Sequence, residues 1–410
     1  MEIRPIFSTL LRNKTAPLLI AAQVALTLAI VCNALYLIKD RLATASRPTG
    51  ADERNLSEIR LYPHRVITDI QDMQRRDIDA IKAVPGVVAA TWTNQIPLGR
   101  SSWMWGGLTA DRANAGDGVT STFYFSGQGD PLVSTLGLHL VEGRDFTPEE
   151  YIDLNPALER RDPSVVIVTR ALGAALFPDA DSYAGRSFFL GNGDEDSEVR
   201  IVGVVNRLQS PAAPASELAE NSMIGPVRFL DPFSRYTVRT EPGNQDRVMA
   251  DVEQALLALR DDRVLLGKRT FSEARASRYS SENMMASLLI AVTCFLLLIT
   301  ASGIVGMASL WVNQRRKQIG VRRALGARRH DILRYFLVEN AMITTGGVLA
   351  GVALALVLNN LLVGALDIPR LPPAYIGATM AVMWILGLAS VLGPAWRAAA
   401  VSPAIATRTA

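Results

Sequence analysis

The chain has 410 residues, 49% of them hydrophobic, and a mean hydropathy of +0.19, which excludes a protein that is water-soluble throughout. Residues 39–283 carry 28 basic and 35 acidic residues, net −7, whereas the remainder carries 14 basic and 4 acidic, net +10, and the two add up to +3. We therefore expect an acidic soluble domain attached to a basic membrane unit.

Near the N-terminus, apolar side chains recur at roughly helical spacing with basic side chains between them, which predicts a cytoplasmic amphipathic helix over residues 1–15. Residues 16–38 then form an apolar run long enough to cross about 30 Å of hydrocarbon at about 1.5 Å per residue. No A-x-A cleavage site follows this run, so we interpret it as a retained first transmembrane helix. Its polar residues Gln23 and Asn33 should face other helices, because an unpaired amide in lipid is costly.

Between residues 39 and 283 the apolar periods shorten and Pro, Gly and Asp interrupt them, which predicts a large α+β domain inserted between the first and second spans. The patterns predict helices at 70–84, 170–177 and 249–259, and strands at 87–93, 165–168, 187–190 and 199–205. The polar run 272–283 should continue as a helix into the next span.

An aromatic group in this domain has two interpretations, core packing, which we favour, or an exterior binding surface. It comprises Trp103, Trp105, Phe123, Tyr124 and Phe125. Two cysteines are too few for a disulfide framework, and we interpret Cys32 and Cys294 as thiols packed like small apolar residues.

Three more apolar runs predict transmembrane helices at 284–311, 335–362 and 374–396, so the protein should be α-helical within the membrane with four spans. The second span is longer than a bilayer requires, and its surplus should project outward as a stalk. In the third span, Gly347 and Gly351 permit close helix contact, although glycine is also common in membrane helices without such a role.

The loop 312–334 carries eight basic residues and one acid, Asp331. A short, strongly basic loop between two spans is cytoplasmic by the positive-inside rule. Both termini, including the tail 397–410, should then be cytoplasmic, and the large domain should lie on the other side. Ile319, Val321, Ala324 and Leu325 are the apolar residues of a short helix in this loop, and Gly326 is well placed as its C′ stop.

Catalytic and cofactor motifs are missing from the sequence. Gly267-Lys268 is the only Gly-Lys pair, and it lacks the surrounding pattern of a phosphate-binding P-loop. His64, His139 and His330 form no HExxH motif, and no cysteines or carboxylates cluster at metal-ligand spacing. We expect a protein that is not an enzyme and binds no cofactor or nucleic acid. A membrane-anchored enzyme whose catalytic triad is assembled from distant residues stays open as a minor alternative.

Glu339 is the clearest single candidate for a functional residue, because an ionisable group about one turn inside a span is a functional candidate by default. The favoured alternative is structural, in which Glu339 snorkels to the inner interface or pairs there with Arg334 or a neighbouring arginine.

Several segments, taken together, resemble the motifs of known protein families. QIGVRRALGARRHDILRYFLVEN, residues 318–340, resembles the cytoplasmic loop and following helix of FtsX-like and MacB-like ABC transporter permeases. The motifs of the large domain resemble, in the same order, the MacB-like periplasmic core domain: TNQIPLG (93–99), LGLHLVEGRDFT (136–147), VVIVTRALGAALFP (165–178), GVV (203–205) and YTVRT (236–240). The resemblance implies two lobes, with the inserted lobe spanning about 127–232.

The resemblance also implies that a separate ABC ATPase, which binds ATP and Mg, contacts the basic loop. The residues that match the family's loop motif are Gln318, Ile319, Gly320, Arg322, Arg323, Ala324, Leu325, Gly326, Ala327 and Arg328. Gln318 stands where the family usually has glutamate, so the salt bridge that this carboxylate would make is in question.

The function that the resemblance implies is that of a permease subunit in the bacterial inner membrane, which transmits ATP-driven motion to a periplasmic domain for export or efflux. Its partners would be the ATPase, membrane lipid and a second permease, either an identical copy or a paired paralogue. A periplasmic adaptor and an outer-membrane channel are further candidates. A regulatory subunit that activates a periplasmic partner without transport is the alternative, and the sequence does not reveal a substrate.

Overall fold

The structure is a computed structural model that describes residues 15–100, 102–111, 118–155, 161–191, 197–211, 217–366 and 370–400. The chain divides into two compact units. The helical unit consists of Met1–Ala43 and Glu282–Ala410, and the α+β unit is Thr44–Ser281. The helix predicted over residues 1–15 and most of the tail 397–410 lie outside the described residues.

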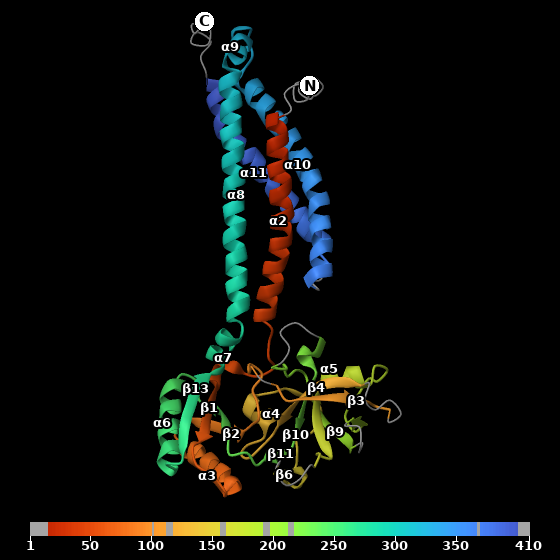
Figure 1. Cartoon of the computed structure of the whole chain (residues 1–410), viewed down its shortest axis with the longest axis vertical. Coiled ribbons are helices and arrows are strands. Elements are labelled where there is room, and N and C mark those ends of the chain that lie inside the picture. Colours follow the sequence, from red (N-terminus) through yellow and green to blue (C-terminus); the bar gives the residue numbers. More distant parts are fainter. Residues whose placement is uncertain are drawn as a thin grey trace. The chain divides into compact units, whose positions relative to one another are not determined.

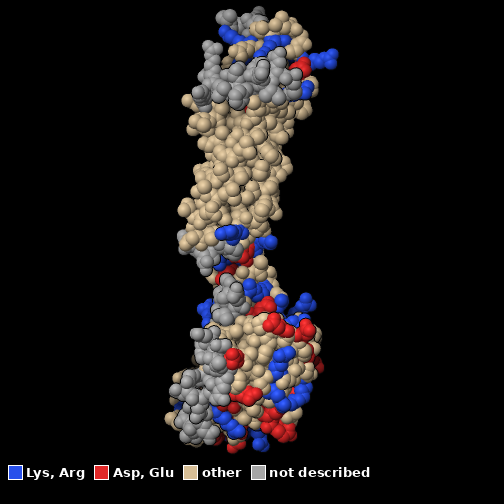
Figure 2. Space-filling view, turned by 90° about the vertical axis from the view of Figure 1, so that its right-hand side faces the viewer, with Lys and Arg blue, Asp and Glu red and all other residues tan. Residues whose placement is uncertain are grey.

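The helical unit contains α2 (Thr15–Ala45), α8 (Ser280–Gln314), α10 (Arg329–Leu366) and α11 (Pro373–Ala400). These four helices are each long and apolar enough to cross a membrane (Figure 1). Their surface is largely uncharged over most of its length, and lysine and arginine side chains gather at the end that carries the short helix α9 (Arg316–Ala324) (Figure 2). An uncharged surface bounded by basic residues is the pattern expected of a membrane-spanning bundle.

Polar side chains join these helices across the apolar interior. The Gln23 amide nitrogen on α2 donates to the carbonyl of Ile299 on α8 at 3.2 Å, and the Asn33 amide nitrogen donates to the carbonyl of Ala355 on α10 at 3.3 Å. The prediction that Gln23 and Asn33 face other helices is confirmed.

The two glycines of the third span pack against α2. A Cβ atom built on Gly347 would lie 2.8 Å from the carbonyl oxygen of Ala21, and one built on Gly351 would lie 2.9 Å from that of Ala25. Real Cβ atoms do not approach this closely, so these two positions allow α2 and α10 to touch backbone to backbone. Close helix contact is therefore the correct interpretation of the pair.

The α+β unit is built on two larger sheets within the described ranges. The first contains β1 (Leu56–Pro63), β2 (Val87–Trp92), β12 (Ser234–Thr240) and β13 (Arg263–Thr270). These strands run antiparallel in the order β13-β1-β12-β2. Helices α3 (Ile70–Ala83) and α6 (Gln245–Leu259) pack against it through buried apolar residues such as Ile78 and Val252.

The second sheet has the order β3-β4-β10-β7-β9-β5, with β8 paired to β9, and it is mixed because β4 and β10, and also β7 and β9, run parallel. Its strands are β3 (Met104–Leu108), β4 (Val119–Phe125), β5 (Leu140–Gly143), β7 (Val165–Thr169), β8 (Ser187–Leu190), β9 (Ser197–Val205) and β10 (Ser222–Gly225). A small parallel pair, β6 (Ile152–Leu154) and β11 (Val227–Phe229), and the short helices α4 (Leu132–Leu136) and α5 (Arg170–Leu176) complete this part. Strands β3 and β4 belong to this second sheet but lie before residues 127–232, the bounds that we expected for the inserted lobe.

The helices and strands predicted for the domain are confirmed to within a few residues, with one exception. The helix predicted through 272–283 is interrupted, because α7 (Phe271–Arg278) ends before Tyr279 and α8 begins at Ser280. Tyr279 is buried, and its hydroxyl accepts a hydrogen bond from the Gln209 amide at 2.6 Å. The helix is interrupted where the Tyr279 side chain is buried, and local helical propensity alone does not predict this interruption.

The aromatic group of the domain is mostly core. Phe123, Tyr124 and Phe125 are buried, whereas Trp103 is 47% exposed and packs edge-on against Phe125 at a ring distance of 5.3 Å. Cys32 is buried, as predicted, whereas Cys294 is exposed on the apolar helix α8.

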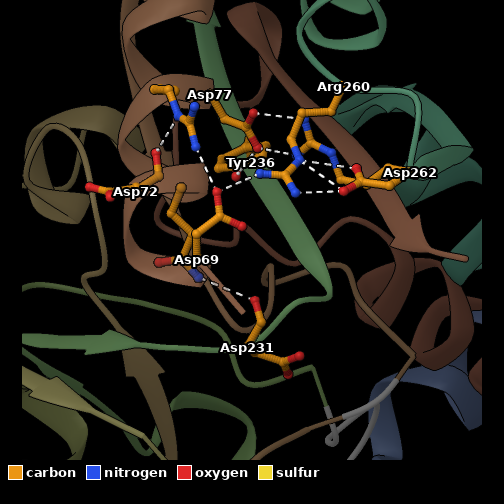
Figure 3. Close-up of polar contacts among 10 residues, drawn as sticks. Asp69, Asp72, Asp77, Asp231, Tyr236, Arg260 and Asp262 are labelled. Atoms are coloured by element: carbon orange, nitrogen blue, oxygen red, sulfur yellow. Dashed lines mark hydrogen bonds and ion pairs between the residues drawn. The ribbon is translucent and has the colours of Figure 1, made fainter. Parts of the chain in front are cut away.

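A buried ion pair closes the first sheet against α3 (Figure 3). Both oxygens of Asp77 accept hydrogen bonds from the Arg263 guanidinium, and the Tyr236 hydroxyl donates to the same carboxylate at 2.6 Å. Nearer the surface, Arg260 bridges Asp69 at 2.8 Å and Asp262 at 2.5 Å. Hydrogen bonds from Arg260 lower the pKa of both Asp69 and Asp262, so these two carboxylates stay charged at neutral pH.

Arg275 on α7 ties together the two ends of the α+β unit. Its guanidinium binds both oxygens of Glu53, at 2.7 and 2.6 Å, and donates to the carbonyls of Ala45 and Arg47. Burial by itself would raise the pKa of Glu53, but hydrogen bonds from Arg275 and Thr49 outweigh it and the pKa is lowered. The chain that enters the unit is thereby bonded to the helix that precedes its exit.

Candidate functional site

Helix α9 forms the centre of the basic loop and ends as predicted. Leu325 is its C-cap, and Gly326 follows with φ of 99°, in the left-handed region that glycine tolerates. The backbone N–H of Gly326 donates to the carbonyl of Arg323, and that of Ala327 donates to the carbonyl of Arg322, each at 3.1 Å. These two bonds form a Schellman motif, which holds the turn after the helix in one conformation.

The apolar residues of α9 and its C-cap do not share one environment. Ile319 is buried in the helical unit's core together with Ile332 and Phe336 of α10. Val321 is 52% exposed and Leu325 is 83% exposed. The helix is therefore anchored on one side and presents apolar side chains to the exterior on another.

A pocket of about 490 Å³ lies between α9 and the start of α10. Six of the ten predicted loop residues line it: Gln318, Ile319, Arg322, Leu325, Gly326 and Ala327. Its other lining residues are Arg315, Asp331, Ile332, Tyr335 and Phe336. The structure thus brings most of the predicted residues to one concave surface.

The other four predicted residues lie outside this pocket. Gly320 is buried, and Ala324 and Arg328 are exposed. Arg323 is half-buried and donates to the carbonyl of Ala399, near the end of α11, at 3.1 Å. Arg323 therefore attaches α9 to the bundle.

Glu339 is 1% exposed and pairs with Arg315, the residue just before α9. One guanidinium nitrogen of Arg315 lies 2.9 Å from each carboxylate oxygen, and the guanidinium also packs 5.9 Å from the Trp311 ring. This pair connects the end of α8 to α10 across the base of α9.

The sequence indicates Glu339 as a candidate, with Arg334 as its first expected partner, whereas the structure pairs it with Arg315. Five residues along a helix place two side chains on different faces, whereas residues three or four apart share a face. Arg315, the partner that the structure shows, lies 24 residues before Glu339 and in another segment, so local spacing does not reveal the pair. Tyr335, which also lies beneath the guanidinium of Arg322 at 5.2 Å, was not predicted as part of the site.

The described residues contain no group of three or more His, Cys, Asp or Glu side chains that could hold a metal ion. In the network of Figure 3, Asp69, Asp77 and Asp262 are paired with Arg76, Arg260 and Arg263, so we assign it a structural role. The surface around α9 is the stronger candidate site.

Comparison with known families assigns both units. The MacB-like periplasmic core domain matches residues 22–255, and the FtsX-like permease C-terminal domain matches residues 290–403. The first match alone covers more than half of the chain.

Curated relatives agree with this assignment. The chain is 28% identical over 309 residues to the pyoverdine export ATP-binding/permease protein PvdT of Pseudomonas syringae pv. tomato, covering 70% of this chain and 43% of that protein. It is 35% identical over 304 residues to PvdT of Pseudomonas putida, covering 68% of this chain and 42% of that protein. It is 28% identical over 239 residues to the macrolide export ATP-binding/permease protein MacB of Agrobacterium fabrum, covering 56% of this chain and 34% of that protein.

The chain thus spans less than half the length of these curated relatives. Two domain matches in chain order, four apolar helices and a sheet-rich domain between the first two of them all agree. The chain belongs to the MacB-like and FtsX-like family of ABC transporter permeases.

Proposed function

We propose that this permease receives ATP-driven motion from an ABC ATPase at α9 and passes it to the α+β unit to drive export. The observation that carries the proposal is the arrangement of α9, which exposes Leu325 and Val321 while Ile319 is fixed in the bundle core. Exposed apolar side chains that are rigidly held form a surface on which a partner can exert force.

The anchoring of α9 supports this role. Ile319 packs with α10, Arg323 bonds to the carbonyl of Ala399 at the end of α11, and Arg315 at its N-cap binds Glu339. Because these contacts reach α10 and α11, and α8 precedes α9 directly in the chain, a displacement of α9 would move the long helices with it.

The proposed setting is a bacterial inner membrane, with α9 in the cytoplasm and the α+β unit in the periplasm. The positive-inside rule supports this orientation, since the loop 312–334 carries eight basic residues and one acid. A second permease completes the proposed complex, and ATP and Mg belong to the ATPase. The names of the relatives favour export over a purely regulatory role, and an adaptor and outer-membrane channel are further proposed partners.

Replacing Leu325 with aspartate tests the coupling. The side chain is 83% exposed, so the change should leave folding intact while it places a charge in the ATPase contact. We expect permease-stimulated ATP turnover by the co-purified ATPase to fall at least about tenfold, since a buried unpaired charge at an interface costs several kcal/mol.

The matched control is Leu266→Asp on β13, which makes the same change at another exposed leucine and should leave turnover as in the wild type. Unchanged turnover in Leu325→Asp would refute the proposed coupling surface.

A further inference from the structure

The charges that line the pocket between α9 and α10 point to what enters it. We infer that this pocket receives an acidic side chain of the ATPase, and that Arg322 is the group that binds it. The inference rests on the proposed function and specifies the chemistry of the contact.

Two of the three charged lining residues already have partners. Arg315 is neutralised by Glu339 at 2.9 Å. Asp331 accepts a hydrogen bond from the backbone N–H of Arg328 at 2.9 Å and lies 3.3 Å from Nδ1 of His330. The charge of Arg315 is therefore already neutralised, and Asp331 is itself an acid that does not attract a carboxylate.

Arg322 differs from both. Among the described residues, no carboxylate lies within ion-pair distance of its guanidinium, which instead stacks over the Tyr335 ring at 5.2 Å. Stacking on an aromatic ring restricts the guanidinium plane without neutralising its charge. The lining of the pocket therefore contains a positioned cation with its hydrogen-bonding capacity still available.

The surroundings would strengthen an ion pair at this point. Ile319, Ile332 and Phe336 are buried and give the pocket an apolar wall. Arg322 itself is exposed, so a bound partner would have to cover it to shield the ion pair from water. A guanidinium can hold a carboxylate through two parallel hydrogen bonds. A volume of about 490 Å³ has room for the tip of a loop with its side chains.

The wider loop favours an acidic protein surface as the occupant. Residues 312–334 carry eight basic residues and one acid, so an acidic partner would be attracted before contact. Leu325 lines the same pocket and is 83% exposed, which suits a partner that presents an apolar residue beside its carboxylate. The headgroup of an anionic lipid would share the charge but would not need this apolar neighbour.

The test compares two arginines of one loop. Arg322→Gln removes the pocket cation, and Arg316→Gln removes the same charge from an arginine that is equally classed as exposed but does not line the pocket. Binding of the purified ATPase to each permease, reconstituted in nanodiscs of zwitterionic lipid, is measured at two salt concentrations. We expect Arg322→Gln to weaken binding at least about tenfold and Arg316→Gln to weaken it less than about twofold.

The conservative variant Arg322→Lys should fall between them, because lysine keeps the charge but lacks the planar pair of donors. Neither substitution at Arg322 should disturb folding, because the Schellman motif uses the backbone carbonyl of Arg322 and not its side chain.

Three results would overturn the inference. Equal losses in the two glutamine variants would mean that only long-range attraction acts. No loss in Arg322→Gln would mean that the pocket plays no part in ATPase binding. A loss that appears only with anionic lipid present would assign the pocket to a lipid headgroup. If Leu325→Asp abolishes ATPase binding while Arg322→Gln does not, this inference fails and the proposed function stands.

Discussion

The pair of Arg315 and Glu339 shows how one buried charge is held at the edge of a membrane bundle. Glu339 is 1% exposed, whereas the Arg315 side chain is 20% exposed. The two groups would therefore respond differently to loss of the other. An orphaned Glu339 would remain in an apolar interior, but an orphaned Arg315 has a path to water along its own long side chain.

This asymmetry predicts the order of stability in a double-mutant cycle. Arg315→Leu should destabilise the protein most, by about 3–5 kcal/mol, because it leaves a buried carboxylate unpaired. Glu339→Leu should cost less, and the double variant should be more stable than Arg315→Leu alone. Thermal unfolding of the four proteins in one detergent measures the cycle, and strictly additive losses would contradict the coupling.

At the scale of elements, the contact between α2 and α10 depends on which glycines face inward. Gly346 and Gly347 are neighbours in sequence, but a Cβ atom on Gly346 would meet nothing within 4 Å, and one on Gly347 would lie 2.8 Å from the carbonyl of Ala21. A single methyl group should thus have opposite effects at adjacent positions.

We predict that Gly346→Ala leaves the bundle as stable as the wild type or stabilises it by up to about 1 kcal/mol, through the higher helix propensity of alanine. Gly347→Ala should destabilise it by about 1–3 kcal/mol, because α2 must move away to admit the Cβ atom. The difference in melting temperature between the two variants is the measurement, and equal shifts would show that the glycines do not set the helix contact.

The elements also show what the sequence could and could not predict. The long apolar runs and the stop at Gly326 follow from local rules, namely bilayer thickness and the conformational freedom of glycine. The break at Tyr279 and the pairing of Arg315 with Glu339 depend on residues 70 and 24 positions away, respectively. Contacts of that kind are set by packing, so no pattern within a window of the chain contains them.

At the scale of the whole molecule, the orientation of the chain in the membrane is the property that an experiment should determine first. In a background with Cys32 and Cys294 replaced by alanine, single cysteines can be placed at Val66, which is 91% exposed, and at Leu325, which is 83% exposed. We predict that an impermeant maleimide labels Val66→Cys in intact cells with a permeabilised outer membrane. Leu325→Cys should react only after the inner membrane is opened, and the reverse pattern would invert the topology.

The tie made by Arg275 has a mechanical consequence. The polypeptide passes between the two units at residues 43–44 and 281–282. Inside the α+β unit, Arg275 bonds the segment after the first passage to the helix before the second. Pulling on either connection therefore loads the same few hydrogen bonds. These bonds hold the two ends of the unit together, so that they are not drawn apart when either connection is pulled.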